Sequence, residues 1–198
     1  MSSEILFASR RFLLTVVVLL LLLMTGARAQ AQSIDEAYRF YRNEQWGEAA
    51  ELLSLRVDRG RAQPGEIALL GMCYINMGEL EKAEEAIEGA YMLAPENYAV
   101  LLARGNLALG KEEFAAAERR FLEAAALRPR RTEAMQGAAM AAFAAGVRLL
   151  QEGRYEEAVP RLRRAAEKLL GTGVKRVIVT LGGRGALVVG PGGSTLVP

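Results

Sequence analysis

Few residues in this 198-residue chain are suited to catalysis. It has no histidine, one cysteine (Cys73) and two aspartates (Asp35 and Asp58). Without histidine a chain has no Ser-His-Asp or Cys-His triad, no histidine general base and no zinc site that uses histidine. A single cysteine forms no internal disulfide. Because no carboxylates are clustered at metal-ligand spacing either, we predict a protein that is not an enzyme, with no cofactor and no metal.

The N-terminal residues carry a targeting pattern. Residues 12–24 are an apolar run (FLLTVVVLLLLLM) that follows two arginines and precedes an Ala-x-Ala sequence. This order predicts a signal peptide over residues 1–29, cleaved after Ala29 or, as the alternative, after Ala31. The run is shorter than the roughly 20 apolar residues that cross a membrane. An uncleaved membrane anchor is the second interpretation.

The signal peptide predicts where the protein acts. We expect a periplasmic or secreted protein, and a membrane-associated one only if the signal is uncleaved. Residues 1–29 contain three arginines and one glutamate, so 22 of the 25 basic and 22 of the 23 acidic residues remain after cleavage. The cleaved chain is therefore neutral. Its basic stretches have no aromatic residues between them, and we predict no nucleic-acid partner.

Two adjacent segments of equal length, 64–97 and 98–131, align without gaps. The residues that coincide are glycine, alanine, proline and one large apolar residue: Gly71 with Gly105, Ala83 with Ala117, Ile87 with Phe121, Ala90 with Ala124, and Pro95 with Pro129. Small residues let two helices cross closely, and a proline ends the second helix. The pattern resembles the tetratricopeptide repeat, a helix-turn-helix unit.

The same frame extends in both directions. Residues 30–63 form a degenerate first unit, and the turn sequence returns at Gly153 after seven additional residues. We therefore predict one lengthened helix over 132–152 and units at about 30–63, 64–97, 98–131 and 132–172. The resemblance implies an all-α fold, a tetratricopeptide-repeat helical solenoid of three to four helix-turn-helix units over residues 30–164, with a short Gly/Val-rich β-like tail.

The tail differs in composition, because eight of residues 171–198 are glycine and many of the others are valine or leucine. Strands are expected over 174–180 and 186–189, and a third over 195–197. Residues 165–198 resemble a fragment of the ribokinase-like sugar kinases, which implies that Thr180, Gly182 and Gly185 face a nucleotide. That family's GAGD motif, which carries the catalytic base, is absent from the sequence. We expect disorder in this tail in preference to a cap packed on the last helices.

In the tetratricopeptide family the first helices line a concave groove that receives peptides. Transferred position by position, this implies a largely apolar groove lined by Ile34, Tyr38, Tyr41, Met72, Ile75, Leu102, Asn106, Leu109 and Phe143. Only Asn106 fits the family's clamp for a peptide carboxylate, so an apolar or amphipathic segment is the expected ligand. The alternative is that several of these side chains belong to the core.

The predicted function is an exported scaffold that binds a protein or peptide partner, and self-association is possible. The alternative is a truncated or fused ribokinase-like carbohydrate kinase fragment without activity.

Overall fold

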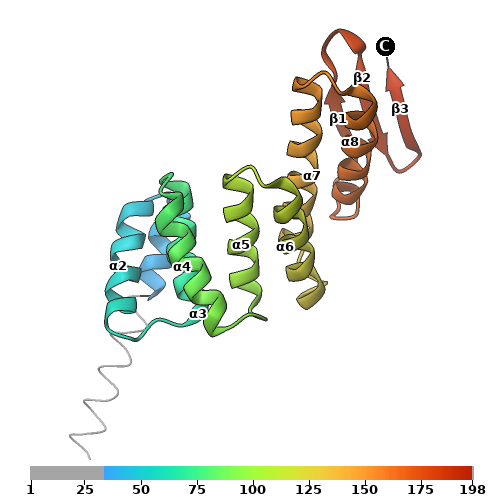
Figure 1. The fold of residues 1–198 in the computed structure, drawn as a ribbon. Coiled ribbons are helices and arrows are strands. Elements are labelled where there is room, and N and C mark those ends of the chain that lie inside the picture. Colours follow the sequence, from blue (N-terminus) through green and yellow to red (C-terminus); the bar gives the residue numbers. More distant parts are fainter. Residues whose placement is uncertain (1–33, 198) are drawn as a thin grey trace, which may run out of the picture.

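The structure, a computed structural model, describes residues 34–197. Helices come first along the chain and a small sheet comes last (Figure 1). Residues 34–42 are helical, and the following helices are α2 Trp46–Asp58, α3 Pro64–Asn76, α4 Leu80–Leu93, α5 Tyr98–Gly110, α6 Phe114–Leu127, α7 Glu133–Gln151 and α8 Tyr155–Leu170. Within the described residues, no helix is both long and apolar enough to cross a membrane.

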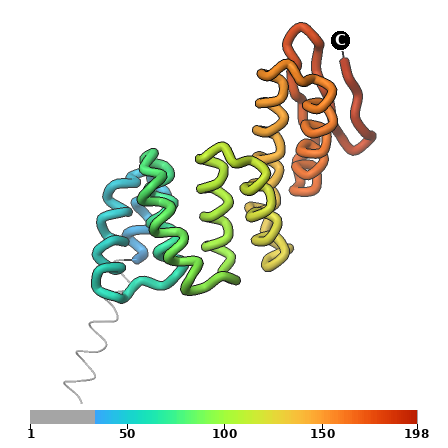
Figure 2. Tube along the Cα trace, viewed as in Figure 1, coloured from blue at the N-terminus to red at the C-terminus, as the bar shows by residue number. Residues whose placement is uncertain are grey.

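The helices form antiparallel hairpins that stack side by side (Figure 2). Each first helix packs on the second helix of its own unit and on a neighbouring unit, as α3 does on α4, α2 and α5. Buried alanines dominate the contacts, with Leu53, Ile87, Phe121 and Leu162 as the large buried side chains. A local signal marks the start of α5, where the Asn97 Oδ1 accepts hydrogen bonds from the amides of Ala99 and Val100.

The turns inside the units show the repeat register directly. Glu44, Gly78, Glu112 and Gly153 all have a left-handed backbone, with φ of 60°, 78°, 59° and 75°. The first three are spaced by one repeat length each, and the fourth comes seven positions later than that spacing requires. Only glycine adopts this conformation without a steric cost. Two units therefore keep the turn geometry even where glutamate occupies the position.

A first-helix glycine faces a large second-helix side chain in three units. A Cβ atom placed on Gly71 would lie 2.3 Å from Ile87, and one placed on Gly105 would lie 2.7 Å from Phe121. A Cβ on Gly146 would lie 2.7 Å from Leu162. Because real Cβ atoms do not approach so closely, these three glycines are required by the helix crossing. The prediction of small residues at the crossings is confirmed.

The lengthened helix α7 has 19 residues, whereas α3 and α5 have 13 each. Its first half packs on α6, where a Cβ on Gly137 would lie 2.6 Å from the Phe121 ring. Its second half packs on α8 through Gly146. The single predicted helix over 132–152 is confirmed, and it joins two packing surfaces that are displaced along its axis.

The tail is an antiparallel sheet in the order β1-β2-β3, formed by β1 Val177–Thr180, β2 Ala186–Gly190 and β3 Gly193–Val197. A 3-10 turn over Gly182–Arg184 joins the first two strands. In the register, Val179 is opposite Leu187, and Leu187 is opposite Leu196. Val179, Leu187 and Val189 are buried against Ala158, Leu162 and Ala166 of α8. The expectation of disorder was wrong, because these apolar side chains cover the outer face of the last helix.

Candidate binding groove

A largely apolar hollow lies where α5, α6, α7, α8 and β1 meet. It has a volume of about 620 Å³. We call it the α7 pocket, and its lining residues are Leu109, Gly110, Glu112, Phe114, Met140, Phe143, Ala144, Leu169, Val177 and Ile178. Several structural elements therefore contribute to one surface that contains a single charged side chain, Glu112.

The length of α7 creates this pocket. Because α8 packs on the second half of α7, α8 and the sheet lie beyond α6 along the α7 axis (Figure 1). The α5–α6 turn consequently faces the middle of α7 and the beginning of β1. Ion pairs connect the displaced α8 to α6: Lys168 and Arg161 both contact Glu118, and the Arg161–Glu118 distance is 3.8 Å.

Two apolar side chains in the pocket are strongly exposed. Met140 is 57% exposed and Ile178 is 61% exposed, although both are large hydrophobic residues. A second hollow of about 430 Å³ continues from the first. The two share Glu112, Phe114, Phe143 and Ala144, and the second adds Val147, Arg148 and Gln151. Exposed apolar surface that continues over two hollows is typical of an interaction site.

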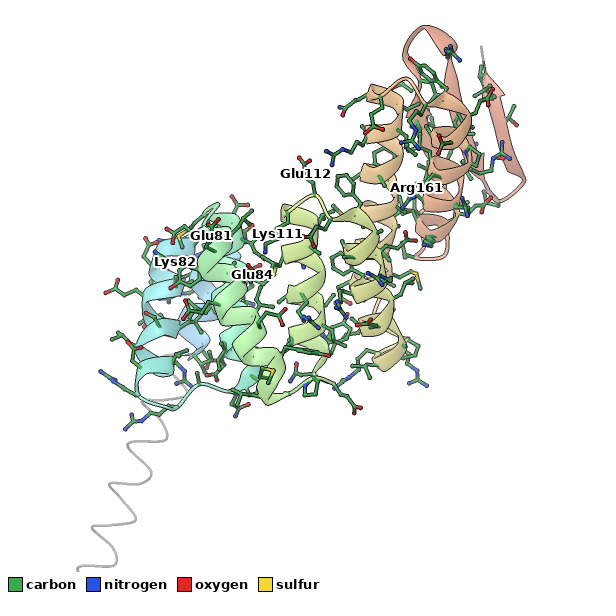
Figure 3. The ribbon with its side chains drawn as sticks, viewed as in Figure 1. Glu81, Lys82, Glu84, Lys111, Glu112 and Arg161 are labelled. Atoms are coloured by element: carbon green, nitrogen blue, oxygen red, sulfur yellow. The ribbon has the colours of Figure 1, made fainter. Side chains whose placement is uncertain are left out.

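The rim of the pocket carries charge. Arg148 lies 3.1 Å from Glu112 and 3.7 Å from Glu152, and its guanidinium carbon is 5.8 Å from the centre of the Phe114 ring. In the same turn, Lys111 lies 2.6 Å from Glu84 on α4, and Figure 3 shows these two side chains between α4 and α5. Exposed pairs of this kind contribute little to stability, so a bound ligand could replace them at low cost.

The comparisons with known proteins agree on the fold. The family model of the tetratricopeptide repeat matches residues 67–97. The first tetratricopeptide domain of human RPAP3 is 15% identical, covers 58% of this chain and 91% of its own, and has a TM-score of 0.53. The structure of MamA is 18% identical, covers 71% of this chain and 78% of its own, and has a TM-score of 0.52. The fold is a tetratricopeptide-repeat solenoid.

A third similar structure contains a ligand. It is the first tetratricopeptide repeat of Spaghetti (RPAP3) bound to the HSP90 peptide SRMEEVD, 15% identical, with 58% of this chain and 91% of its own covered and a TM-score of 0.51. No curated protein has a sequence that matches this chain. At these identities the similarity concerns the fold of the repeat array.

The structure brings two of the predicted groove residues together. Leu109 of α5 and Phe143 of α7 both line the α7 pocket. The other seven predicted residues are distributed along the earlier first helices. Tyr38 is 44% exposed, whereas Tyr41 packs edge-on against Trp46 with ring centres 5.0 Å apart. Burial raises the pKa of Tyr41, and a hydrogen bond with Asn76 partly offsets this.

The remaining predicted residues are half-buried. Met72 and Ile75 pack against the cluster of Ile87 and Leu107, and Ile34 packs against the first unit's cluster. Leu102 packs against the buried side chains of α6 and α7. The Nδ2 of Asn106 donates a hydrogen bond to the Leu102 carbonyl at 2.9 Å. These side chains belong partly to the walls of the solenoid, as the alternative interpretation allows.

Sequence reasoning did not identify Phe114, Val177 or Ile178 as pocket residues. Phe114 begins a second helix, and the other two lie in the tail, so none belongs to the first-helix positions that the family pattern implies. The seven additional residues in α7 were the sequence signal that could have indicated this pocket. They indicate a displacement of the last hairpin, but the sequence does not show which strand then lies beside the displaced helix.

The remaining candidates for chemistry are isolated. Cys73 is buried, and burial raises the pKa of its thiol to about 11, so it is protonated at neutral pH. Among the described residues no group of His, Cys, Asp and Glu could hold a metal ion. Thr180 pairs with Ala186 in the sheet, Gly182 begins the 3-10 turn and Gly185 follows it. The predicted signal peptide lies outside the described residues.

Proposed function

We propose that this protein is an exported, non-catalytic scaffold that binds an apolar or amphipathic segment of another protein. The observation that carries the proposal is the α7 pocket, where Met140 and Ile178 are exposed beside the half-buried Phe143 and Leu109. Repeat arrays of this fold accommodate peptides, as the structure of Spaghetti with the HSP90 peptide SRMEEVD illustrates. Export rests on the pattern in residues 1–29.

The chemistry of the pocket favours a different ligand from the acidic SRMEEVD peptide. Its floor is formed by methionine, phenylalanine, leucine, valine and isoleucine, and its rim contains both signs of charge, Arg148 and Glu112. A segment with two or three large apolar side chains would bury Met140 and Ile178, which is the favourable term in such binding. A polar residue next to these side chains could pair with Arg148 or Glu112.

A peptide-display selection tests the proposal. The wild-type protein should enrich peptides with two or three large apolar residues, and Met140→Asp should lower the affinity for a selected peptide at least tenfold, because the peptide would then desolvate a carboxylate. Leu55→Asp is the matched control, because Leu55 is 43% exposed on α2, away from the pocket. Peptides that bind both variants equally would show that the pocket is not the binding site.

A second pair of variants separates this pocket from the rest of the predicted groove. Tyr38→Ala with Leu102→Ala truncates two predicted groove residues that do not line the pocket, without placing a charge in the solenoid wall. If the ligand occupies only the α7 pocket, this double variant keeps its affinity. If the double variant loses affinity to the same extent as Met140→Asp, the ligand extends along the whole groove. Circular dichroism of each variant verifies that the helices remain folded.

A further inference from the structure

The hairpin topology gives the array two edges. The loops that join successive units, residues 59–63, 94–97 and 128–132, all lie at one edge, which is the lower one in Figure 2. We call this the inter-unit edge. The turns inside the units, residues 43–45, 77–79, 111–113 and 152–154, lie at the opposite ends of the helices.

The two edges carry opposite charge. The inter-unit loops contain five arginines and one glutamate, whereas the turns inside the units contain five glutamates, one lysine and one arginine. All five loop arginines are exposed: Arg59, Arg61, Arg128, Arg130 and Arg131. The cations on the opposite edge are neutralised, because Lys111 pairs with Glu84, and Arg154 pairs with Glu152 and Glu157.

The loop arginines are available to a ligand. Within the described residues, the side chains of Arg128 and Arg130 make no ion pair or hydrogen bond. The guanidinium carbon of Arg131 lies 5.5 Å from the Tyr98 ring centre, which leaves its N–H groups free to donate. A hollow of about 420 Å³ is lined by Leu127, Pro129 and the three arginines.

Large apolar side chains protrude at the same edge. Met92 and Leu93 end α4 and are 82% and 66% exposed, and Leu127 ends α6 and is 39% exposed. Met92 has the highest exposure of any large hydrophobic residue in the described chain. Exposed arginines beside protruding apolar side chains are the combination found at surfaces that lie in the interface of a membrane.

The direction of the chain agrees with this orientation. The helix over residues 34–42 ends at the turn 43–45, so it begins at the inter-unit edge. Nine residues lie between Met24, the end of the apolar run, and Ile34. A chain of that length spans at most roughly 35 Å. In the interpretation with an uncleaved anchor, the membrane that holds the run therefore lies within that distance of this edge.

We propose that the inter-unit edge binds the surface of a membrane that contains anionic phospholipids. Arg128, Arg130 and Arg131 contact headgroup phosphates, and Met92 and Leu93 enter the interface. A lipid surface fits better than an acidic peptide, because Met92 and Leu93 protrude from the end of α4 and do not line the hollow beside the arginines. This surface shares no residue with the α7 pocket, so a ligand in that pocket stays accessible.

Vesicle sedimentation of the full chain tests the proposal. Vesicles of phosphatidylcholine alone are compared with vesicles that contain about 30% phosphatidylglycerol, at low and at high salt. We expect strong preference for the anionic vesicles and its loss at high salt. The variant Arg128→Glu/Arg130→Glu/Arg131→Glu should lower partition into anionic vesicles by roughly 100-fold or more. The leader, with three arginines and one glutamate, itself favours anionic vesicles, so the measured quantity is the difference between the wild type and each variant, which carry the same leader.

Matched variants show where the effect arises. Arg119→Glu/Arg163→Glu/Arg164→Glu makes the same charge change at exposed positions on α6 and α8, away from the edge, and should lower partition far less. Arg59→Glu/Arg61→Glu, on a separate loop of the edge, should cause a partial loss. Met92→Ser/Leu93→Ser should lower partition at least fivefold without changing the salt dependence.

Several outcomes would overturn the proposal. Equal partition into neutral and anionic vesicles would remove its electrostatic basis, and an equal loss in both arginine triple variants would reduce the effect to net charge. Release by 10 mM inorganic phosphate at constant ionic strength would identify a site for free phosphate. Release by a polyglutamate peptide at micromolar concentration would identify an acidic protein partner. Circular dichroism establishes that each variant is folded before it is compared.

Discussion

The second, third and fourth units use the same kind of helix crossing, but in the fourth unit the crossing lies seven residues further along the first helix. In each, a first-helix glycine contacts a large second-helix side chain: Gly71 with Ile87, Gly105 with Phe121, and Gly146 with Leu162. In α7 a second glycine, Gly137, meets Phe121 from the preceding unit. Phe121 is therefore enclosed by glycines from two units, whereas Ile87 meets the glycine of its own unit, Gly71.

This difference shows how a short insertion can create a binding surface in a regular array. The crossing contact fixes where the second helix of a unit packs on the first. Because this contact lies seven residues further along α7 than in the regular units, α8 and the sheet are displaced along α7. Seven residues are close to two helical turns, and the same helix face is therefore presented at both positions. The regular units stack closely, and the displaced unit leaves the α7 pocket beside the α5–α6 turn.

The largest expected effect distinguishes Phe121 from Ile87. Phe121→Ala should lower the free energy of unfolding by about 4 kcal/mol, and Ile87→Ala by about 3 kcal/mol, because truncation leaves a cavity in both cores and Phe121 also supports α7. Urea denaturation followed by circular dichroism measures both values. Equal losses, or a larger loss for Ile87→Ala, would mean that the contact between Phe121 and Gly137 adds nothing to the stability of the array.

The repeat could be predicted from the sequence because its signals are local and recur. Gly71, Ala83 and Pro95 return one repeat length later as Gly105, Ala117 and Pro129, and each has one steric role. Gly153 marks the seven-residue shift for the same reason. Gly137 gives no such signal, because α7 is rich in alanine and no aligned unit contains an equivalent glycine. Its role depends on Phe121, which lies in the preceding helix and belongs to another unit.

The site was less predictable than the fold. Leu109 and Phe143 lie at family groove positions and do line the α7 pocket, but Val177 and Ile178 reach it only because the sheet packs on α8. Val-rich strands separated by glycines do not reveal the surface that they will cover. Arg56 gives a similar example: it occupies the position of a buried alanine in other units, and it is buried with Glu66 of α3 at 2.9 Å.

The next largest effect tests whether the displaced crossing is as tight as the regular ones. Gly146→Ala should lower the free energy of unfolding by about 2 kcal/mol, because the added Cβ would overlap Leu162. Gly89→Ala is the matched control on α4, where a Cβ has no neighbour within 4 Å, and it should raise stability by up to about 1 kcal/mol. Thermal unfolding measures both effects. A shift of Tm in the same direction for both variants would contradict the expected overlap with Leu162.

A smaller effect is expected for the ion pairs that connect the displaced α8 to α6. Glu118 is 23% exposed and contacts both Lys168 and Arg161, so Glu118→Gln should cost about 1 kcal/mol. Glu123→Gln on the same helix removes an exposed pair with Arg120 and should cost less than about 0.5 kcal/mol. High salt should reduce the difference between the two variants, and a difference that is independent of salt would argue against an electrostatic origin.

The smallest effect concerns the left-handed turns, where Glu44 and Glu112 occupy the position that Gly78 and Gly153 hold in other units. Glu44→Gly should raise the free energy of unfolding by about 0.5 kcal/mol, because the relief of the left-handed strain exceeds the entropy that glycine adds to the unfolded chain. Glu112→Gly should raise it less, because it also removes the contact between Glu112 and Arg148 at the pocket rim. Urea titrations in low salt compare the two. A larger gain for Glu112→Gly would show that the Arg148–Glu112 pair destabilises the folded protein. Replacement of that pair by contacts with a ligand would then be favourable.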